Sequence, residues 1–159
     1  MCKILNSNFF RRSPDIVAKE LVGKLICVQS GNTVNRYRNT ETEAYFGTEK
    51  FCYGYGEKRL KLKSTVFYSV ARLYHYYGML MFSCNNSNCP DNVLIRGVEG
   101  CSGPVKVLNK LNVLKTENGA ELTENNTVFL VNDGAAPKIA ESTRTGINSV
   151  KKLNFKAKL

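Results

Sequence analysis

The sequence predicts a single compact α+β domain. Its 159 residues suit one domain, and 43% of them are hydrophobic, which is enough to bury a sizeable core. Segments with helical start and stop signals occur beside alternating strand patterns, and two pairs of strands are joined by glycine turns as hairpins.

The first part of the chain predicts a helix followed by a β-hairpin. Ser13-Pro14-Asp15 supplies a capping hydroxyl, a proline suited to a first turn, and an acid near the positive end of the helix. Four apolar residues then share one helical face: Val17, Ala18, Leu21 and Val22. Gly23 ends the helix, and strands are expected at 24–29 and 33–45, with a turn between them.

The second of these strands carries the most informative motif, Glu41-Thr42-Glu43-Ala44-Tyr45-Phe46-Gly47. Alternation along a strand puts Glu41, Glu43 and Tyr45 on one side. A core strand would have Val or Ile in place of Glu, and a solvated strand has little use for the tyrosine. The pairing suits a pocket that stacks a flat ring and activates water beside it.

The next segment, residues 47–64, is expected to be irregular. Glycines alternate there with tyrosines, including Tyr53, and five basic residues are present, including Arg59. Aromatic and basic side chains interleaved on a loop suit a surface that stacks bases and holds phosphates. A solvated loop with incidental tyrosines is the alternative.

Residues 66–84 predict an aromatic hairpin with its turn at Tyr77-Gly78-Met79. Tyr74 and Tyr76 then share one face. A tyrosine at a hairpin tip exposes apolar area unless something packs against it, and DNA-bending and base-flipping proteins use such wedges. The alternative is a hairpin that is simply half core and half surface.

The later elements are a strand over 92–98, a helix from Gly103-Pro104 through Leu111, and a strand over 127–131. Arg96 interrupts the first strand, and its permanent charge needs a partner such as Glu43, a phosphate or water. An exposed Arg96 on an edge strand is the alternative. The basic tail, residues 151–159, is expected to contact phosphate or to fray.

Charge points to a polyanionic partner. Lys and Arg number 23 against 13 Asp and Glu, for a formal net charge of +10, and nucleic acid is the commonest polyanion that such a surface binds. No long apolar run or strongly amphipathic basic helix supports a membrane partner. A basic surface kept for solubility is the alternative.

The amino end lacks the apolar block of a signal peptide, so an intracellular protein with reduced cysteines is expected, nuclear in a eukaryote, cytoplasmic or nucleoid-associated in a bacterium. The six cysteines include no C-x-x-C pair. The one metal hypothesis groups Cys84, Cys89 and Cys101 with His75, and small, partly buried thiols without metal are favoured over it.

A series of motifs occurs in one order from Phe9 to Ile147. They are Phe9-Phe10, Ser13-Pro14, Ala18-x-x-Leu21-x-Gly23-Lys24, Glu41-Thr42-Glu43-Ala44-Tyr45-x-Gly47, Tyr77-Gly78-Met79, Val93-Leu94-Ile95-Arg96, Gly103-Pro104-x-Lys106 and Thr143-Arg144-x-Gly146-Ile147. The ordered set resembles the alkyladenine (3-methyladenine) DNA glycosylases of the mammalian type.

The resemblance implies one domain over residues 1–159, with a curved, mostly antiparallel sheet flanked by helices and a protruding β-hairpin. It implies a monomeric hydrolase without cofactor that flips alkylated purines, such as 3-methyladenine, out of double-stranded DNA. The enzyme would hydrolyse the N-glycosidic bond in base excision repair, without a Schiff base or strand cleavage.

The resemblance also implies roles for particular residues. Glu43 would be the general base for the attacking water, and Arg96 would help to position that water or a phosphate. Four residues would contact the flipped base or line its pocket: Tyr45, Tyr53, Tyr74 and Cys84. Five would contact DNA, the first of them filling the gap in the duplex: Tyr77, Gly78, Met79, Arg59 and Arg144.

Two positions depart from the family pattern. Tyr53 (or Gly54) stands where the family usually has a histidine facing the base, and Cys84 stands where it often has an asparagine, with Asn85 one step on. These departures bear on substrate range. They also leave open a damaged-DNA-binding protein without catalysis and a general nucleic-acid-binding module.

Overall fold

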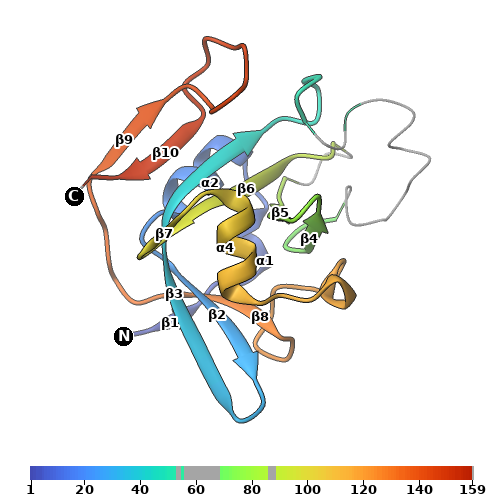
Figure 1. The fold of residues 1–159 in the computed structure, drawn as a ribbon, viewed down its shortest axis with the longest axis vertical. Coiled ribbons are helices and arrows are strands. Elements are labelled where there is room, and N and C mark those ends of the chain that lie inside the picture. The colour runs from blue at the N-terminus through green and yellow to red at the C-terminus, as the bar shows by residue number, and fades with distance from the viewer. Residues whose placement is uncertain (53–54, 56–68, 86–88, 159) are drawn as a thin grey trace.

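The computed structural model describes residues 1–52, 55, 69–85 and 89–158 (Figure 1). Within these ranges ten strands form one strongly curled sheet, and its strand pairings are antiparallel, so the predicted α+β class is confirmed. The strands are β1 (Lys3–Ile4), β2 (Leu25–Ser30), β3 (Thr33–Tyr45), β4 (Leu73–Tyr76), β5 (Met79–Ser83), β6 (Asn92–Val98), β7 (Cys101–Ser102), β8 (Val128–Asn132), β9 (Ile139–Ser142) and β10 (Asn154–Ala157). In the described residues the α-helices are α1 (Ser7–Phe10), α2 (Pro14–Leu21) and α4 (Pro104–Leu111), and η2 (Lys115–Glu117) is a 3₁₀ helix.

The long strand β3 changes its neighbours along its length. Its first half pairs with β2, and its second half pairs with β6 on one edge and with β10 on the other. The register with β6 shifts on both sides of Glu41. Because such bulges bend a strand and increase its twist, they curl the sheet at the start of the acidic motif.

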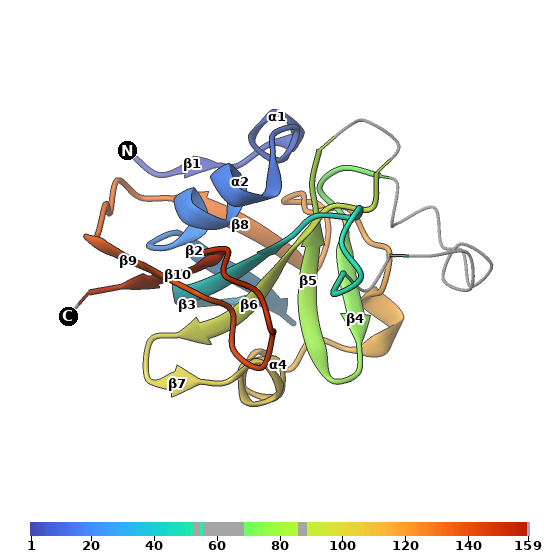
Figure 2. The same ribbon diagram turned by 90° about the horizontal axis from the view of Figure 1, so that it is seen from above.

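Helix α2 packs against β3 and β6, and α4 packs against β5 and β6 (Figure 2). The Thr42 hydroxyl donates to the Ala18 carbonyl at 2.6 Å, which fixes α2 against the face of β3 opposite Glu41 and Glu43. The predicted helix is confirmed, but its predicted cap is wrong. The Ser13 hydroxyl donates to the Asp15 carboxylate instead of accepting from a backbone N–H.

The predicted hairpin is confirmed, with β4 and β5 joined by Tyr77 and Gly78. Both turn residues have positive φ, +52° and +70°, as in a type I′ turn whose twist matches that of the strands. The two faces of this hairpin pack into two different hydrophobic clusters. Leu73, Leu80 and Phe82 lie in the main core, together with residues of α2 and α4. A second, smaller cluster consists of Tyr74, Met81 and Leu94, with Tyr45, Tyr76 and Met79 packed against it.

The last strands, β9 and β10, were not predicted. Asn154 and Phe155 of β10 are buried and pair with Glu43 and Thr42 of β3, whereas Lys156 is exposed. The frayed tail is therefore wrong for residues 154–157, because an apolar and an amide side chain are buried between its lysines. No helix in the described ranges is both long and apolar enough to cross a membrane.

Candidate active site

A cleft of about 320 Å³ opens on the face of the sheet away from α2. It lies between β3, β5, β6, the hairpin tip and the segment after β9. Its lining residues are Glu43, Tyr45, Phe51, Tyr77, Met79, Met81, Asn92, Leu94, Arg96, Thr145 and Ile147. The walls are mostly apolar, and the few polar groups converge near Glu43, as is usual for a small-molecule site.

A larger hollow, of about 580 Å³, lies between β1, α2 and the chain before β9. Its one lining carboxylate, Glu20, is half-exposed and pairs with Arg12. Surface ion pairs of this kind contribute little to stability. The Glu20 carboxylate is also exposed to solvent instead of being enclosed in the hollow. The smaller cleft is therefore the better candidate for chemistry.

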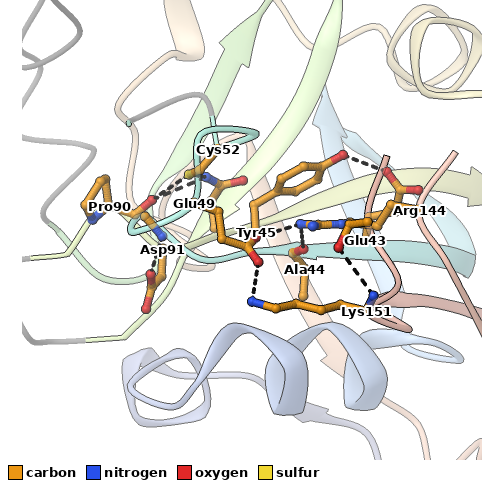
Figure 3. Close-up of polar contacts among 12 residues, drawn as sticks. Glu43, Ala44, Tyr45, Glu49, Cys52, Pro90, Asp91, Arg144 and Lys151 are labelled. Carbon is orange, nitrogen blue, oxygen red and sulfur yellow. Dashed lines mark hydrogen bonds and ion pairs between the residues drawn. The ribbon is translucent and has the colours of Figure 1, made fainter. Parts of the chain in front are cut away.

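Glu43 is buried at the floor of the cleft, with its side chain 1% exposed. Its Oε1 accepts a hydrogen bond from the Tyr45 hydroxyl at 2.9 Å (Figure 3). Its Oε2 accepts from the Thr145 backbone N–H at 2.8 Å and from Asn154 Nδ2 at 3.2 Å. A carboxylate oxygen can accept two hydrogen bonds, so Oε1 retains a lone pair for a water in the cleft.

A second carboxylate lies beside the first. Asn154 Nδ2 also donates to Glu41 Oε1 at 2.9 Å, so one amide bridges both acids. Arg96 Nε lies 3.4 Å from Glu41 Oε1 and 3.9 Å from Glu43 Oε2. The exposed-edge alternative for Arg96 is wrong, because β6 lies between β3 and β5 and the Arg96 side chain is only 17% exposed.

The Tyr45 ring lies between the cleft and a buried guanidinium. Arg144 Cζ lies 4.8 Å from the ring centroid, and its Nη1 donates to the Ala44 carbonyl and to Glu49 Oε2, each at 3.0 Å. Burial, and next the nearby Glu43 carboxylate, raise the pKa of the Tyr45 hydroxyl. That hydroxyl therefore stays protonated and donates to Glu43, and the Arg144 guanidinium supports the face of the ring away from the cleft.

Arg144 is not at a surface that DNA could reach. Its side chain is wholly buried, with contacts to the backbone, a carboxylate and a ring. Burial alone would raise the pKa of Glu49, but hydrogen bonds from Lys151 and Arg144 outweigh it and hold that pKa below its usual value. The predicted DNA contact through Arg144 is therefore replaced by an internal role in this structure.

The other predicted residues are distributed unevenly around the cleft. Tyr77 is 74% exposed at the hairpin tip and, with Met79, lines the cleft, while Gly78 completes the turn. Tyr74 is fully buried behind the wall, in the cluster with Met81 and Leu94. Tyr53 and Arg59 lie outside the described residues.

Cys84 does not line the cleft. It is 1% exposed in the main core, and burial raises the pKa of its thiol well above the usual value. The expectation that it faces the base is wrong because Cys84 follows Leu80 and Phe82 at alternate positions toward the main core, whereas Met79 and Met81 line the cleft. The amide that lines the cleft is that of Asn92.

Sequence reasoning missed Asn92, Thr145 and Asn154. The first alternates with Leu94 and Arg96 along β6, a signal that was available from the sequence. The other two lie more than 100 positions from Glu43, and no local pattern links them to it.

Metal ligands do not gather in the part of the chain that the structure describes. No group of three or more His, Cys, Asp or Glu residues there could hold an ion, and the six cysteines are free thiols. Burial, with a hydrogen bond to Asp91, raises the pKa of Cys89 to about 11, which keeps this thiol protonated and a poor ligand.

Comparison with known proteins gives a consistent result. A family model described as methylpurine-DNA glycosylase (MPG) matches residues 8–101. Similar curated proteins bear the name "Putative 3-methyladenine DNA glycosylase". One from Shouchella clausii is 28% identical, covering 91% of this chain and 85% of that protein. One from Sodalis glossinidius is 30% identical (91% and 89%), and one from Borrelia garinii is 34% identical (79% and 76%).

Proposed function

Because this chain belongs to the methylpurine-DNA glycosylase family, confirming the resemblance in its motifs, we propose that it excises alkylated purines from duplex DNA. The products would be a free base and an abasic site. The observation that carries the proposal is the Glu43 carboxylate, buried at the floor of a cleft beside Tyr45 with one lone pair of Oε1 uncommitted.

The proposed reaction is a hydrolysis at C1′ of the flipped nucleotide. A water donates to Glu43 Oε1, and its oxygen bonds to C1′ as its proton passes to the carboxylate. The C1′–N bond breaks, and its electron pair leaves with the base. Alkylation places positive charge on the base, so the base departs neutral.

The charges around Glu43 suit the sugar in this reaction. Two acids and one base, Glu41, Glu43 and Arg96, together carry a formal charge of −1. The guanidinium lies nearer to Glu41 than to Glu43. The sugar develops positive charge as the base departs, and a carboxylate that shares its one nearby cation with Glu41, in a mostly apolar cleft, would stabilise it. Asn154 and the Thr145 N–H hold that carboxylate in place.

Two tyrosines support the extrusion of a base. Flipping costs a few kcal/mol, less for a damaged base, and stacking on an aromatic ring contributes about 1–3 kcal/mol per base. Tyr45 offers the cleft face of a ring held by Arg144. Tyr77 projects from the hairpin tip, where it would fill the gap in the duplex.

The test compares Glu43→Gln with Glu41→Gln for release of 3-methyladenine from methylated duplex DNA under single-turnover conditions. In Glu43→Gln the Tyr45 hydroxyl can reverse and accept, so the fold should persist. Loss of a general base should slow release by about 10²- to 10⁴-fold. Glu41 is the matched control: it bonds the same Asn154 but does not line the cleft, so a smaller loss is expected.

Equal release by wild type and Glu43→Gln would refute the catalytic role. A protein that binds lesion duplex tightly and releases no base would instead be a damaged-DNA-binding protein. Equal binding to undamaged single strands would indicate a general nucleic-acid-binding module. Salt dependence cannot separate these cases, because all of them involve phosphate contacts.

A further inference from the structure

The wall of the cleft beside Tyr45 contains one buried amide, that of Asn92. The residue is fully buried at the start of β6, and it lines the cleft together with Leu94 and Arg96, which follow at alternate positions on the same face. In the register of β3 and β6, Asn92 is the direct partner of Tyr45.

The orientation of this amide is set by its surroundings. Asn92 Nδ2 donates to Cys52 Sγ at 3.2 Å and lies 3.4 Å from the Pro90 carbonyl. A carbonyl oxygen only accepts, so the nitrogen end of the amide must face Pro90. Oδ1 therefore points the other way, and it has no hydrogen-bond partner within the described chain.

The backbone that orients Asn92 is itself held. The Gly47 N–H donates to the Asp91 carboxylate at 2.7 Å. Gly47 also lies so close to Pro90 that a Cβ there would be 2.4 Å from the proline Cδ. Rotation of the amide would place Asn92 Oδ1 against the Pro90 carbonyl oxygen, and the tight packing of Gly47 on Pro90 prevents the backbone from moving away. The unpaired acceptor is a fixed feature of the site.

The position of Asn92 relative to Glu43 indicates which edge of a base it would meet. The Tyr45 backbone lies opposite Asn92, while the Tyr45 hydroxyl reaches Glu43, so the tyrosine spans the distance between the two. A purine stacked on this ring with its sugar at Glu43 extends along the same direction. The edge farthest from the sugar, which carries N1 between C2 and C6, then lies toward Asn92.

We propose that Asn92 Oδ1 accepts a hydrogen bond from the 6-amino group of the flipped purine, so that the enzyme favours alkylated adenines over 6-oxopurines. This rests on the glycosylase function proposed above. A 6-amino group donates and satisfies the buried acceptor, whereas a 6-oxo group places a second acceptor against it and leaves both unpaired. Asn92 is thus a specificity-determining residue that the motifs do not reveal.

The experiment measures 3-methyladenine and 3-methylguanine released from the same methylated duplex DNA, since both bases carry the alkyl group at N3 and differ at C6 and C2. Wild type should release 3-methyladenine about 10- to 100-fold faster. In Asn92→Leu, which has a similar size but no acceptor, the ratio should fall to within about threefold. The matched control, Met81→Leu, changes an apolar residue in the same wall and should alter both rates by one factor.

Each outcome separates the two proposals. A ratio that Asn92→Leu leaves unchanged overturns the role of Asn92 while the glycosylase function stands. A purely structural role would lower both rates equally, and a thermal melt of each variant detects it. If Asn92→Leu does not fold, Asn92→Ala takes its place. If wild type releases neither base, the glycosylase proposal fails, and binding of free 3-methyladenine against 3-methylguanine then tests the acceptor directly.

Discussion

Replacing Arg144 with glutamine tests whether this arginine holds the site from inside or contacts DNA. Its guanidinium is buried against the Tyr45 ring and donates to the Ala44 carbonyl and Glu49. Removing one partner of a buried ion pair typically costs about 3–5 kcal/mol. Glu49 retains Lys151 at 2.7 Å, so the lower end, about 3 kcal/mol, is expected.

That loss is large enough to measure by thermal unfolding. For a domain of this size each kcal/mol lowers Tm by about 2–4 °C, so Arg144→Gln should lower it by about 6–12 °C. Base release should also slow, because the ring that stacks the base loses its support. Arg36→Gln, an exposed change on β3, is the control and should shift Tm by no more than about 2 °C.

A DNA contact would leave a different signature. An arginine that neutralises one phosphate contributes about 0.9 to the slope of log K against log salt concentration. An internal Arg144 leaves this slope unchanged in Arg144→Gln. A slope reduced by about 0.9, with Tm unchanged, would refute the internal role and restore the phosphate contact predicted from the sequence.

Two further predictions concern the hairpin tip and the stability of the fold at low pH. Tyr77→Asn should keep or raise stability, because asparagine suits the positive φ of a type I′ turn. The same change should weaken binding to lesion duplex by about 10- to 100-fold through lost stacking, as measured by fluorescence anisotropy. Glu49 has a lowered pKa, so its contribution to stability is complete above the ordinary value of 4.5 and is lost as pH falls through the lower folded value. The difference in Tm between wild type and Glu49→Gln should therefore shrink from about pH 6 to about pH 3, and a difference independent of pH would contradict this.

Local sequence patterns were sufficient to predict the helix, the hairpins and the face on which the acidic motif places its side chains. Alternation placed Glu43 and Tyr45 on one face, and the structure joins them by a hydrogen bond between neighbours two residues apart. The hairpin turn followed from Tyr77-Gly78, because a two-residue turn with positive φ is a local property of the backbone. These features depend on few residues close together in the chain.

The partners of Glu43 could not be predicted in this way. Thr145 and Asn154 reach it across 102 and 111 positions, and only the curl of the sheet brings β10 against β3. Arg144 was expected to contact DNA because of the family resemblance, but burial beside Glu49 and Tyr45 gives it a different role. Cys84 was assigned by counting along the hairpin, and that count does not show that Cys84 faces the main core together with Leu80 and Phe82.

The distribution of charge around the cleft explains how a strongly basic chain can present a carboxylate to its substrate. Two networks of ion pairs meet at Tyr45, and each contains three charged groups, so neither is neutral. Glu49 is paired with two cations, Arg144 and Lys151, whereas one cation, Arg96, serves both Glu41 and Glu43. The site therefore has a net positive side behind the stacking ring and a net negative side where the sugar would lie. A chain of formal net charge +10 would attract the backbone of DNA while the cleft would stabilise a cation, because the partly buried Tyr45 ring lies between the two networks.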